Sequence, residues 1–148
     1  MQLSEHFTLE EATFSSTAVR LGIDNTPTQQ MIDNAAEAAK GMELVRTLLG
    51  FPVHVDSWCR VPLLNSAVNG SKGSDHMNGW AIDFICAAFG VPLDIVKAII
   101  ASGIKFDKCV QEGTWIHISF NPLMRGITLT AHFDRLDAEG HPTYTQGI

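Results

Sequence analysis

The sequence predicts an α+β fold in which helices pack on a small, mainly antiparallel sheet. One long segment repeats its apolar residues at three- and four-residue steps, as an amphipathic helix does. Several shorter segments instead alternate apolar and polar residues, as half-buried strands do. The chain has 148 residues, of which 45% are hydrophobic, so we expect a single domain with one core over residues 1–148.

The first third of the chain carries two helix-start signals. Thr8-Leu9-Glu10-Glu11 matches the capping box, so a short helix is expected to begin there. Residues 15–25 show no clear period and are expected to form an ordered loop. A long helix is predicted over residues 27–49, with Thr26 as its N-cap and Pro27 at its first position. Its apolar stripe comprises Met31, Ala35, Ala38, Met42, Val45 and Leu49.

The middle of the chain alternates between strands and loops. Residues 51–57 follow a period of two and predict a strand, and residues 65–73 form a loop rich in Asn, Gly and Ser. A second strand is predicted over residues 80–86. Pro92 then opens a helix that Gly103 ends. The second strand has two faces, one with Trp80, Ile82 and Phe84 and the other with Ala81, Asp83 and Ile85.

The last third predicts more of the sheet. Residues 106–111 and 114–120 are expected to be paired strands, linked near Glu112-Gly113. A further strand is predicted over residues 127–133. The tail from residue 134 is polar and is expected to be loosely held.

The charge balance limits the partners of the chain. It has 10 Lys and Arg against 16 Asp and Glu, for a net charge of -6, and no basic stripe. Nucleic acid and anionic membrane surfaces are therefore not expected as partners. No apolar run reaches the ~18 residues of a membrane span.

The start of the chain and its cysteines both bear on the compartment in which the protein is made. Met1 to Glu5 lack the basic and apolar regions of a signal peptide, so we expect synthesis in the cytoplasm without a leader. The cysteines are odd in number and show no C-x-x-C pair, so they are expected to be reduced and mostly buried. They are Cys59, Cys86 and Cys109.

Three residues predict a metal site. Asp83 lies in an apolar strand, where a carboxylate is unfavourable unless it is paired or bound to a cation. His76 precedes it after a glycine-rich loop, and Gly79 allows a close turn between them. His117 shares a strand face with Trp115 and Ser119. Two imidazoles and one carboxylate favour one Zn²⁺ per chain with an open coordination position, although other first-row ions fit the same donors.

Hydrolysis at such a centre needs further groups. A zinc ion with an open position lowers the pKa of water toward ~7 and polarises a carbonyl. Glu112, near the strand of His117, is the candidate acid and base, and Arg60 is a candidate for a substrate carboxylate or an oxyanion. Ser74 and Trp115 are candidates to contact the substrate. Taken singly, each residue has an ordinary structural role, so the prediction rests on their conjunction.

The pattern resembles a known family. Ser74-x-His76-x-x-Gly79-x-Ala81-x-Asp83 followed by Trp115-x-His117 is similar to the zinc D-Ala-D-Ala carboxypeptidases and L-alanyl-D-glutamate endopeptidases, which share a fold with the hedgehog signalling domain. The similarity covers most of residues 3–120 and looks like the compact branch found in phages and prophages. Its outer segments are Leu3-Ser4, Phe7 to Glu11, Asn25 to Pro27, Ser57-x-x-Arg60, Asn65, Phe106-Asp107 and Glu112 to Phe120.

The resemblance implies a hedgehog/DD-peptidase-like fold and roles for particular residues. Zinc would lie on His76, Asp83 and His117, with Glu112 as the acid and base and Arg60 positioning the substrate. Many members carry the acid three residues before the last histidine, where this chain has threonine. A bulge at the glycine after Glu112 is expected to aim its carboxylate at the metal.

The resemblance also implies a substrate. The leading hypothesis is a phage or prophage lytic endopeptidase, or endolysin, that cuts the L-alanyl-D-glutamate bond of the peptidoglycan stem peptide. It would act as a monomer on the cell wall after holin-type release or as part of a virion. A D-Ala-D-Ala carboxypeptidase, with Arg60 holding a terminal carboxylate, is one alternative. A non-catalytic binding module that contains zinc is the other.

Overall fold

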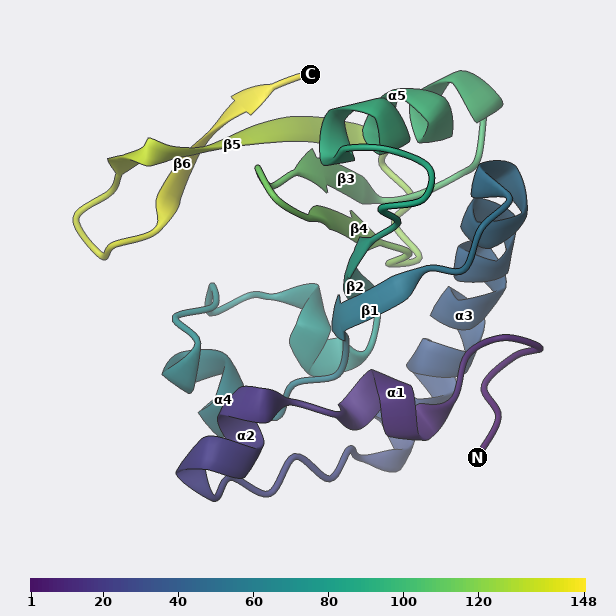
Figure 1. Ribbon diagram of the computed structural model, residues 1–148. Coiled ribbons are helices and arrows are strands. Elements are labelled where there is room, and N and C mark those ends of the chain that lie inside the picture. Colours follow the sequence, from purple (N-terminus) through teal and green to yellow (C-terminus); the bar gives the residue numbers. More distant parts are fainter.

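Six strands form one mixed sheet in the order β1-β2-β4-β3-β5-β6 (Figure 1). The computed structural model describes all 148 residues. The strands are β1 (His54–Ser57), β2 (Ala81–Ile85), β3 (Lys108–Gln111), β4 (Ile116–Ser119), β5 (Ile127–Leu136) and β6 (Pro142–Gln146). All neighbouring pairs are antiparallel except β3 and β5, which are parallel. The predicted α+β fold with a mainly antiparallel sheet is confirmed.

Five α-helices and one 3₁₀ helix surround this sheet. They are α1 (Leu9–Thr13), α2 (Ser16–Leu21), α3 (Gln29–Leu49), α4 (Pro62–Ala67), η1 (Asp75–Asn78) and α5 (Pro92–Ser102). Helices α3 and α5 contact each other and cover one side of the central strands (Figure 1). The other side of those strands carries the site.

The alternation of side chains along β2 and β4 separates the core from the site. Ile82 and Phe84 of β2 and Ile118 of β4 are fully buried in the core cluster, beside the apolar faces of α3 and α5. Asp83 pairs directly with His117 and points to the opposite face. Burial of the large apolar side chains fixes the register, because a slip of one residue would turn them to the wrong face.

The long helix starts two residues later than its sequence predicts. Thr28, and not Thr26, is the N-cap, since its hydroxyl accepts a hydrogen bond from Met31 N at 3.2 Å. Thr26 instead donates two hydrogen bonds to Asp24 Oδ1, one from its hydroxyl and one from its backbone N–H. The N-terminal prediction is confirmed, because Thr8 caps α1 by accepting from Glu11 N at 3.1 Å.

Two predicted loops contain short helices. Residues 15–25 include α2, which Ser15 caps at its start and Gly22 ends at φ +67°. The predicted loop over residues 65–73 overlaps α4, which begins at Pro62. Helices of six residues are too short to show a hydrophobic period, so only their caps could have revealed them.

Strand β1 begins at His54, later than the predicted residue 51, while β2 and α5 fall within their predicted bounds. The larger correction concerns the C-terminal tail. The sequence predicts a loosely held tail from residue 134, but β5 continues to Leu136 and β6 pairs with it in an antiparallel hairpin. Polar and apolar residues alternate along this exposed two-stranded ribbon, but the Gly and Pro residues of the tail hide that alternation in the sequence.

The three cysteines, Cys59, Cys86 and Cys109, are free and buried, as predicted. None of the helices combines the length and the apolar character that crossing a bilayer requires.

Candidate metal centre and active site

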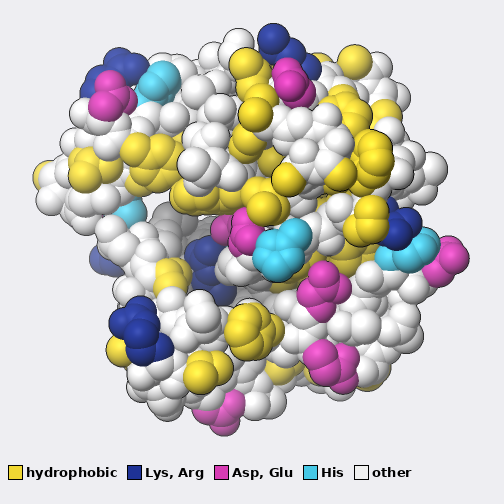
Figure 2. Space-filling model, in the orientation of Figure 1, with side chains coloured by type: hydrophobic (Ala, Val, Ile, Leu, Met, Phe, Trp, Pro, Cys, Tyr) yellow, Lys and Arg dark blue, Asp and Glu magenta, His cyan; other side chains and the backbone are white.

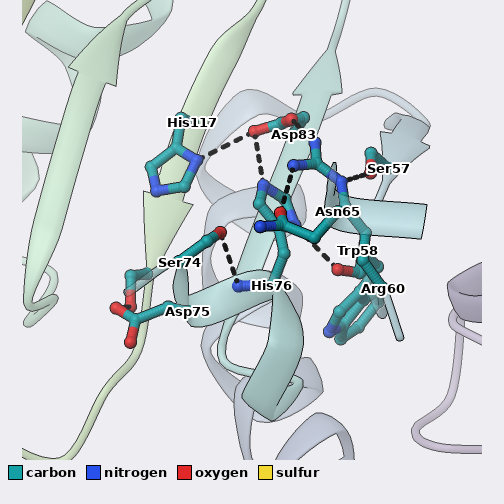
Figure 3. Close-up of polar contacts among 10 residues, drawn as sticks. Ser57, Trp58, Arg60, Asn65, Ser74, Asp75, His76, Asp83 and His117 are labelled. Carbon is teal, nitrogen blue, oxygen red and sulfur yellow. Dashed lines mark hydrogen bonds and ion pairs between the residues drawn. The ribbon is translucent and has the colours of Figure 1, made fainter. Parts of the chain in front are cut away.

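His76, Asp83 and His117 converge at the floor of a cleft (Figure 3). One donor atom from each residue lies within 4.8 Å of the others. Asp83 Oδ1 lies 3.2 Å from His76 Nε2 and 2.9 Å from His117 Nδ1. Ligand atoms of a tetrahedral zinc with bonds of 2.0–2.1 Å are separated by about 3.3 Å. The three side chains therefore already have nearly the spacing that such an ion needs.

Strand pairing explains why two of these residues meet. Asp83 and His117 are direct partners across β2 and β4. Directly opposed residues in an antiparallel pair hold their Cβ atoms about 5 Å apart on the same face. The carboxylate and the imidazole are thus neighbours by the register of the sheet.

His76 reaches the same point from the 3₁₀ helix η1. Ser74 caps this helix by accepting a hydrogen bond from His76 N at 3.2 Å. Gly79 ends it at φ +82°, where a Cβ atom would lie 2.5 Å from the carbonyl oxygen of Met31. Only glycine fits this turn against α3, and the predicted close turn between His76 and Asp83 is confirmed.

The segment that contains Trp58 and Arg60 braces the histidine. His76 Nδ1 lies 2.7 Å from the carbonyl oxygen of Trp58, and its own carbonyl oxygen accepts from Arg60 N at 3.0 Å. The indole of Trp58 also donates to the carbonyl oxygen of Gly79 at 2.9 Å. A carbonyl oxygen can only accept, so Nδ1 carries the proton and Nε2 keeps its lone pair for a ligand.

The electrostatics of the three residues fit a cation. Burial lowers the pKa of His76, which favours its neutral, metal-binding form. Burial opposes ionisation of Asp83, but the interaction with His76 and the hydrogen bond from His117 outweigh it and lower the pKa of the carboxyl below its usual range. His76 Nε2 is buried and has no hydrogen-bond partner, because its contact with Asp83 is close but poorly oriented for one. An orphaned buried nitrogen beside a carboxylate fits a zinc ligand set.

Arg60 holds the carboxylate from the other side. Its Nη2 atom donates to Asp83 Oδ2 at 3.1 Å, which leaves Oδ1 facing the two histidines (Figure 3). Its remaining contacts are from Nε to Ser57 Oγ at 2.9 Å and from Nη1 to Asn65 Oδ1 at 3.4 Å. The guanidinium is therefore fixed against the carboxylate, although it also lines the cleft.

Glu112 lies in the same cleft, in the turn between β3 and β4. Glu112 is buried, with 8% of its surface exposed. Burial raises the pKa of its carboxyl to about 7, although His117 and Arg60 act in the opposite direction. A carboxyl group that titrates near neutral pH suits proton transfer in both directions.

The turn around Glu112 also places Thr114, the residue three positions before His117. Thr114 is exposed and does not line the cleft, whereas Glu112 is buried and lines it. The predicted bulge at Gly113 is wrong, because β3 and β4 pair regularly from Lys108 and Ser119 to their ends. Gly113 instead occupies the hairpin turn at φ +80°, where Glu112 N donates to the carbonyl oxygen of Trp115 at 3.0 Å.

The other predicted contact residues line the cleft, which has a volume of about 620 Å³. Ser74 lines it, and its hydroxyl caps η1. Trp115 stacks at a tilt against Phe133 of β5, with ring centres 5.6 Å apart. Figure 2 shows the surface hollowed between the β5–β6 hairpin and the region of α4, with basic and acidic side chains inside the hollow.

A model of the Peptidase M15 family matches residues 5–119. The chain belongs to the Peptidase M15 family. Members of this family are zinc metallopeptidases related to the D-Ala-D-Ala carboxypeptidases. The match includes all three residues of the metal centre as well as Arg60 and Glu112, while β5 and β6 of this M15 chain lie beyond it. A search of the curated proteins found no match.

Several residues that shape this M15 site were not predicted from sequence to do so. The carbonyl oxygen of Trp58 orients His76, but a backbone contact leaves no signal in the sequence. Asp75 accepts from Ser119 Oγ at 2.6 Å and from Asn121 Nδ2 at 3.0 Å, which ties η1 to the end of β4. The β5–β6 hairpin was also missed as a wall of the cleft, since only the fold brings it there.

Proposed function

We propose that this M15 family member is a zinc peptidase that hydrolyses a bond in the peptidoglycan stem peptide, as a phage or prophage lytic endopeptidase of the L-alanyl-D-glutamate type. One observation carries this proposal. Three donors that fit zinc and a buried Glu112 with a pKa near 7 line the same open cleft. A site that only stored a structural metal would have no need of that acid.

The chain's residues supply what hydrolysis needs. His76, Asp83 and His117 would hold the ion, which when bound supplies Lewis-acid activation of water and of the peptide carbonyl. Glu112 takes a proton from the attacking water onto its carboxylate. It then delivers that proton to the amine nitrogen that leaves.

Arg60 has a positioning role in this scheme. It pairs with the outer oxygen of Asp83 and is itself fixed by Ser57 and Asn65. The inner oxygen is thereby kept toward the two histidines. Ser74 and Trp115 are proposed to contact the substrate from the two sides of the cleft, with the indole held in place by Phe133.

The endopeptidase proposal is favoured by the way Arg60 is used. A carboxypeptidase must bind a free terminal carboxylate, and the guanidinium is already committed to Asp83. Lys108 favours the D-Ala-D-Ala carboxypeptidase as a second candidate, because it lines the cleft and forms no ion pair with a carboxylate. The two candidates share the same chemistry and differ in which end of the peptide is held.

The experiment is mass spectrometry of purified muropeptides after incubation with the zinc-loaded protein. Glu112→Gln is the control, because it removes the proton-transfer group and keeps the shape of the side chain. Separation of L-alanine from the rest of the stem by the wild type alone supports the endopeptidase. Loss of a terminal D-alanine establishes the carboxypeptidase instead. No cleavage by a verified zinc-loaded protein contradicts both and leaves the binding module.

A further inference from the structure

The β5–β6 hairpin forms one wall of the cleft. Its lining residues include the apolar Leu129, Phe133 and Leu136, the polar Asp137 and His141, and Tyr144. The facing wall is the loop that runs from α4 to η1, and Asn69 of this loop lies beside Gly140 at the turn of the hairpin. Figure 1 shows the hairpin extending from the sheet above that loop. The hairpin and this loop therefore face each other across the cleft.

The hairpin is fixed to the turn that carries Glu112. The ring of Phe133 packs against Trp115 and lies within 3.6 Å of the position that a Cβ atom at Gly113 would occupy. Strand β3 pairs in parallel with β5 from Lys108 to Gln111, which fixes the register between the two elements. The wall is therefore part of the sheet that holds the site, and its side chains have defined positions relative to Glu112.

The sheet register places Tyr144 near Glu112. Val110 pairs with Leu129, so the next residues on the same face are Glu112 and Ala131. Ala131 in turn pairs with Tyr144 across β5 and β6. The small side chain of Ala131 lies between them and leaves room for the phenol ring, which is a long side chain, to lean toward Glu112.

The surroundings of the phenol agree with this placement. Tyr144 is 47% exposed, and its partial burial together with the negative charges of Glu112, Asp83 and Asp137 raises the pKa of its phenol to about 12. The hydroxyl therefore stays protonated and can donate a hydrogen bond at any working pH. No hydrogen bond within the chain involves this hydroxyl, although it belongs to a residue that lines the cleft.

We propose that Tyr144 contacts the substrate by donating a hydrogen bond to a carbonyl oxygen of the bound stem peptide, and that it makes the hairpin the substrate-selecting wall. This inference rests on the proposed function. The nearby carboxylates of Glu112 and Asp83 can accept hydrogen bonds, and the carbonyl oxygens of a bound peptide are acceptors too. The cleft therefore needs a hydrogen-bond donor for those carbonyl oxygens. A phenol donor near the proton-transfer group matches that need, and the wall also offers the apolar side chains of Leu129, Phe133 and Leu136.

The test uses the fact that Tyr144 is the only tyrosine of the chain. Tyrosine labelled with ¹³C gives one set of ring signals, which reports on this side chain alone. The labelled protein carries the Glu112→Gln substitution and is loaded with zinc, so that it can bind muropeptide without cleaving it. The kinetic arm compares Tyr144→Phe with Thr145→Val, which removes a hydroxyl from the adjacent residue on the opposite face of β6.

We expect muropeptide to shift the ring signals of Tyr144. We also expect Tyr144→Phe to lower kcat/KM by about 10-fold, as for one lost hydrogen bond, with zinc affinity unchanged. Thr145→Val should keep the wild-type kcat/KM. Unchanged ring signals up to the solubility limit of the muropeptide, or wild-type kcat/KM in Tyr144→Phe, would overturn the inference. If the wild type cleaves no peptide, the proposed function fails, and the ring signals still decide whether Tyr144 contacts the peptide.

Discussion

At the scale of one residue, burial of the Glu112 carboxyl lowers the free energy of unfolding at neutral pH. Its carboxyl is 8% exposed and has a pKa of about 7, against an ordinary value of 4.5. Between these values the folded chain binds a proton that the unfolded chain has lost. The free energy of unfolding therefore falls as pH rises through this window, and the loss is complete above pH ~7.

Replacing the carboxyl should restore this stability. Without metal, Glu112→Gln is expected to raise the free energy of unfolding at pH 8 by up to about 3 kcal/mol, because that is the value of a pKa raised from 4.5 to about 7. At pH 4 the gain should vanish. Urea unfolding at both pH values, with a chelator present, measures it. A gain of equal size at both pH values would show that the gain does not come from the charge of Glu112. The control Glu139→Gln, at an exposed position, should leave the free energy of unfolding unchanged at both pH values.

The residues of the site were predictable where a motif supplies them. The spacing of His76, Asp83 and His117 was sufficient to predict that their side chains converge, because strand alternation places Asp83 and His117 on one face. Tyr144 could not be predicted, since its proximity to Glu112 depends on the pairing of β3 with β5 across a long connection. No local pattern of residues carries that information.

At the scale of elements, the turn of η1 decides where His76 lies. Gly79 has φ +82°, and an added Cβ atom would lie 2.5 Å from a backbone oxygen of α3. Gly50 has a similar φ of +72° but has no atom within 4 Å of the same position. The two glycines thus share the backbone strain of a substitution and differ only in the clash.

This pair gives a controlled prediction. Gly50→Ala should lower the free energy of unfolding by about 1 kcal/mol, from the left-handed conformation alone. Gly79→Ala should lower it by roughly 2 kcal/mol or more and should also weaken zinc binding, because η1 must move away from α3. Urea unfolding and zinc calorimetry measure the two effects. Equal effects of both substitutions on stability, with zinc affinity intact, would contradict this account of the turn.

The elements themselves divide by length. The long helix α3 and helix α5 were predictable from their periods, whereas α2 and α4 were not, because six residues hold fewer than two helical turns. The hairpin β5–β6 was missed beyond residue 133 because the end of β5, the polar turn and β6 together have the composition of a loose tail.

At the scale of the whole molecule, one sheet joins the candidate metal centre, Glu112 and the hairpin wall of the cleft. The centre lies on β2 and β4 with η1, Glu112 lies in the β3–β4 turn, and the hairpin extends the same sheet from β3. Helices α3 and α5 support this sheet from behind. The fold thus lets the cleft collect groups from distant parts of the chain without a separate domain.

The central claim is that one zinc ion, held by His76, Asp83 and His117, makes this cleft a peptidase site. The most direct test is to remove all metal with a chelator and then add zinc back in steps, while cleavage of purified muropeptides is followed. We expect no cleavage at the start, a linear rise, and a plateau at one zinc per chain. His117→Ala should show no such rise. Full cleavage by the metal-free protein, or a rise in His117→Ala equal to that of the wild type, would contradict the account.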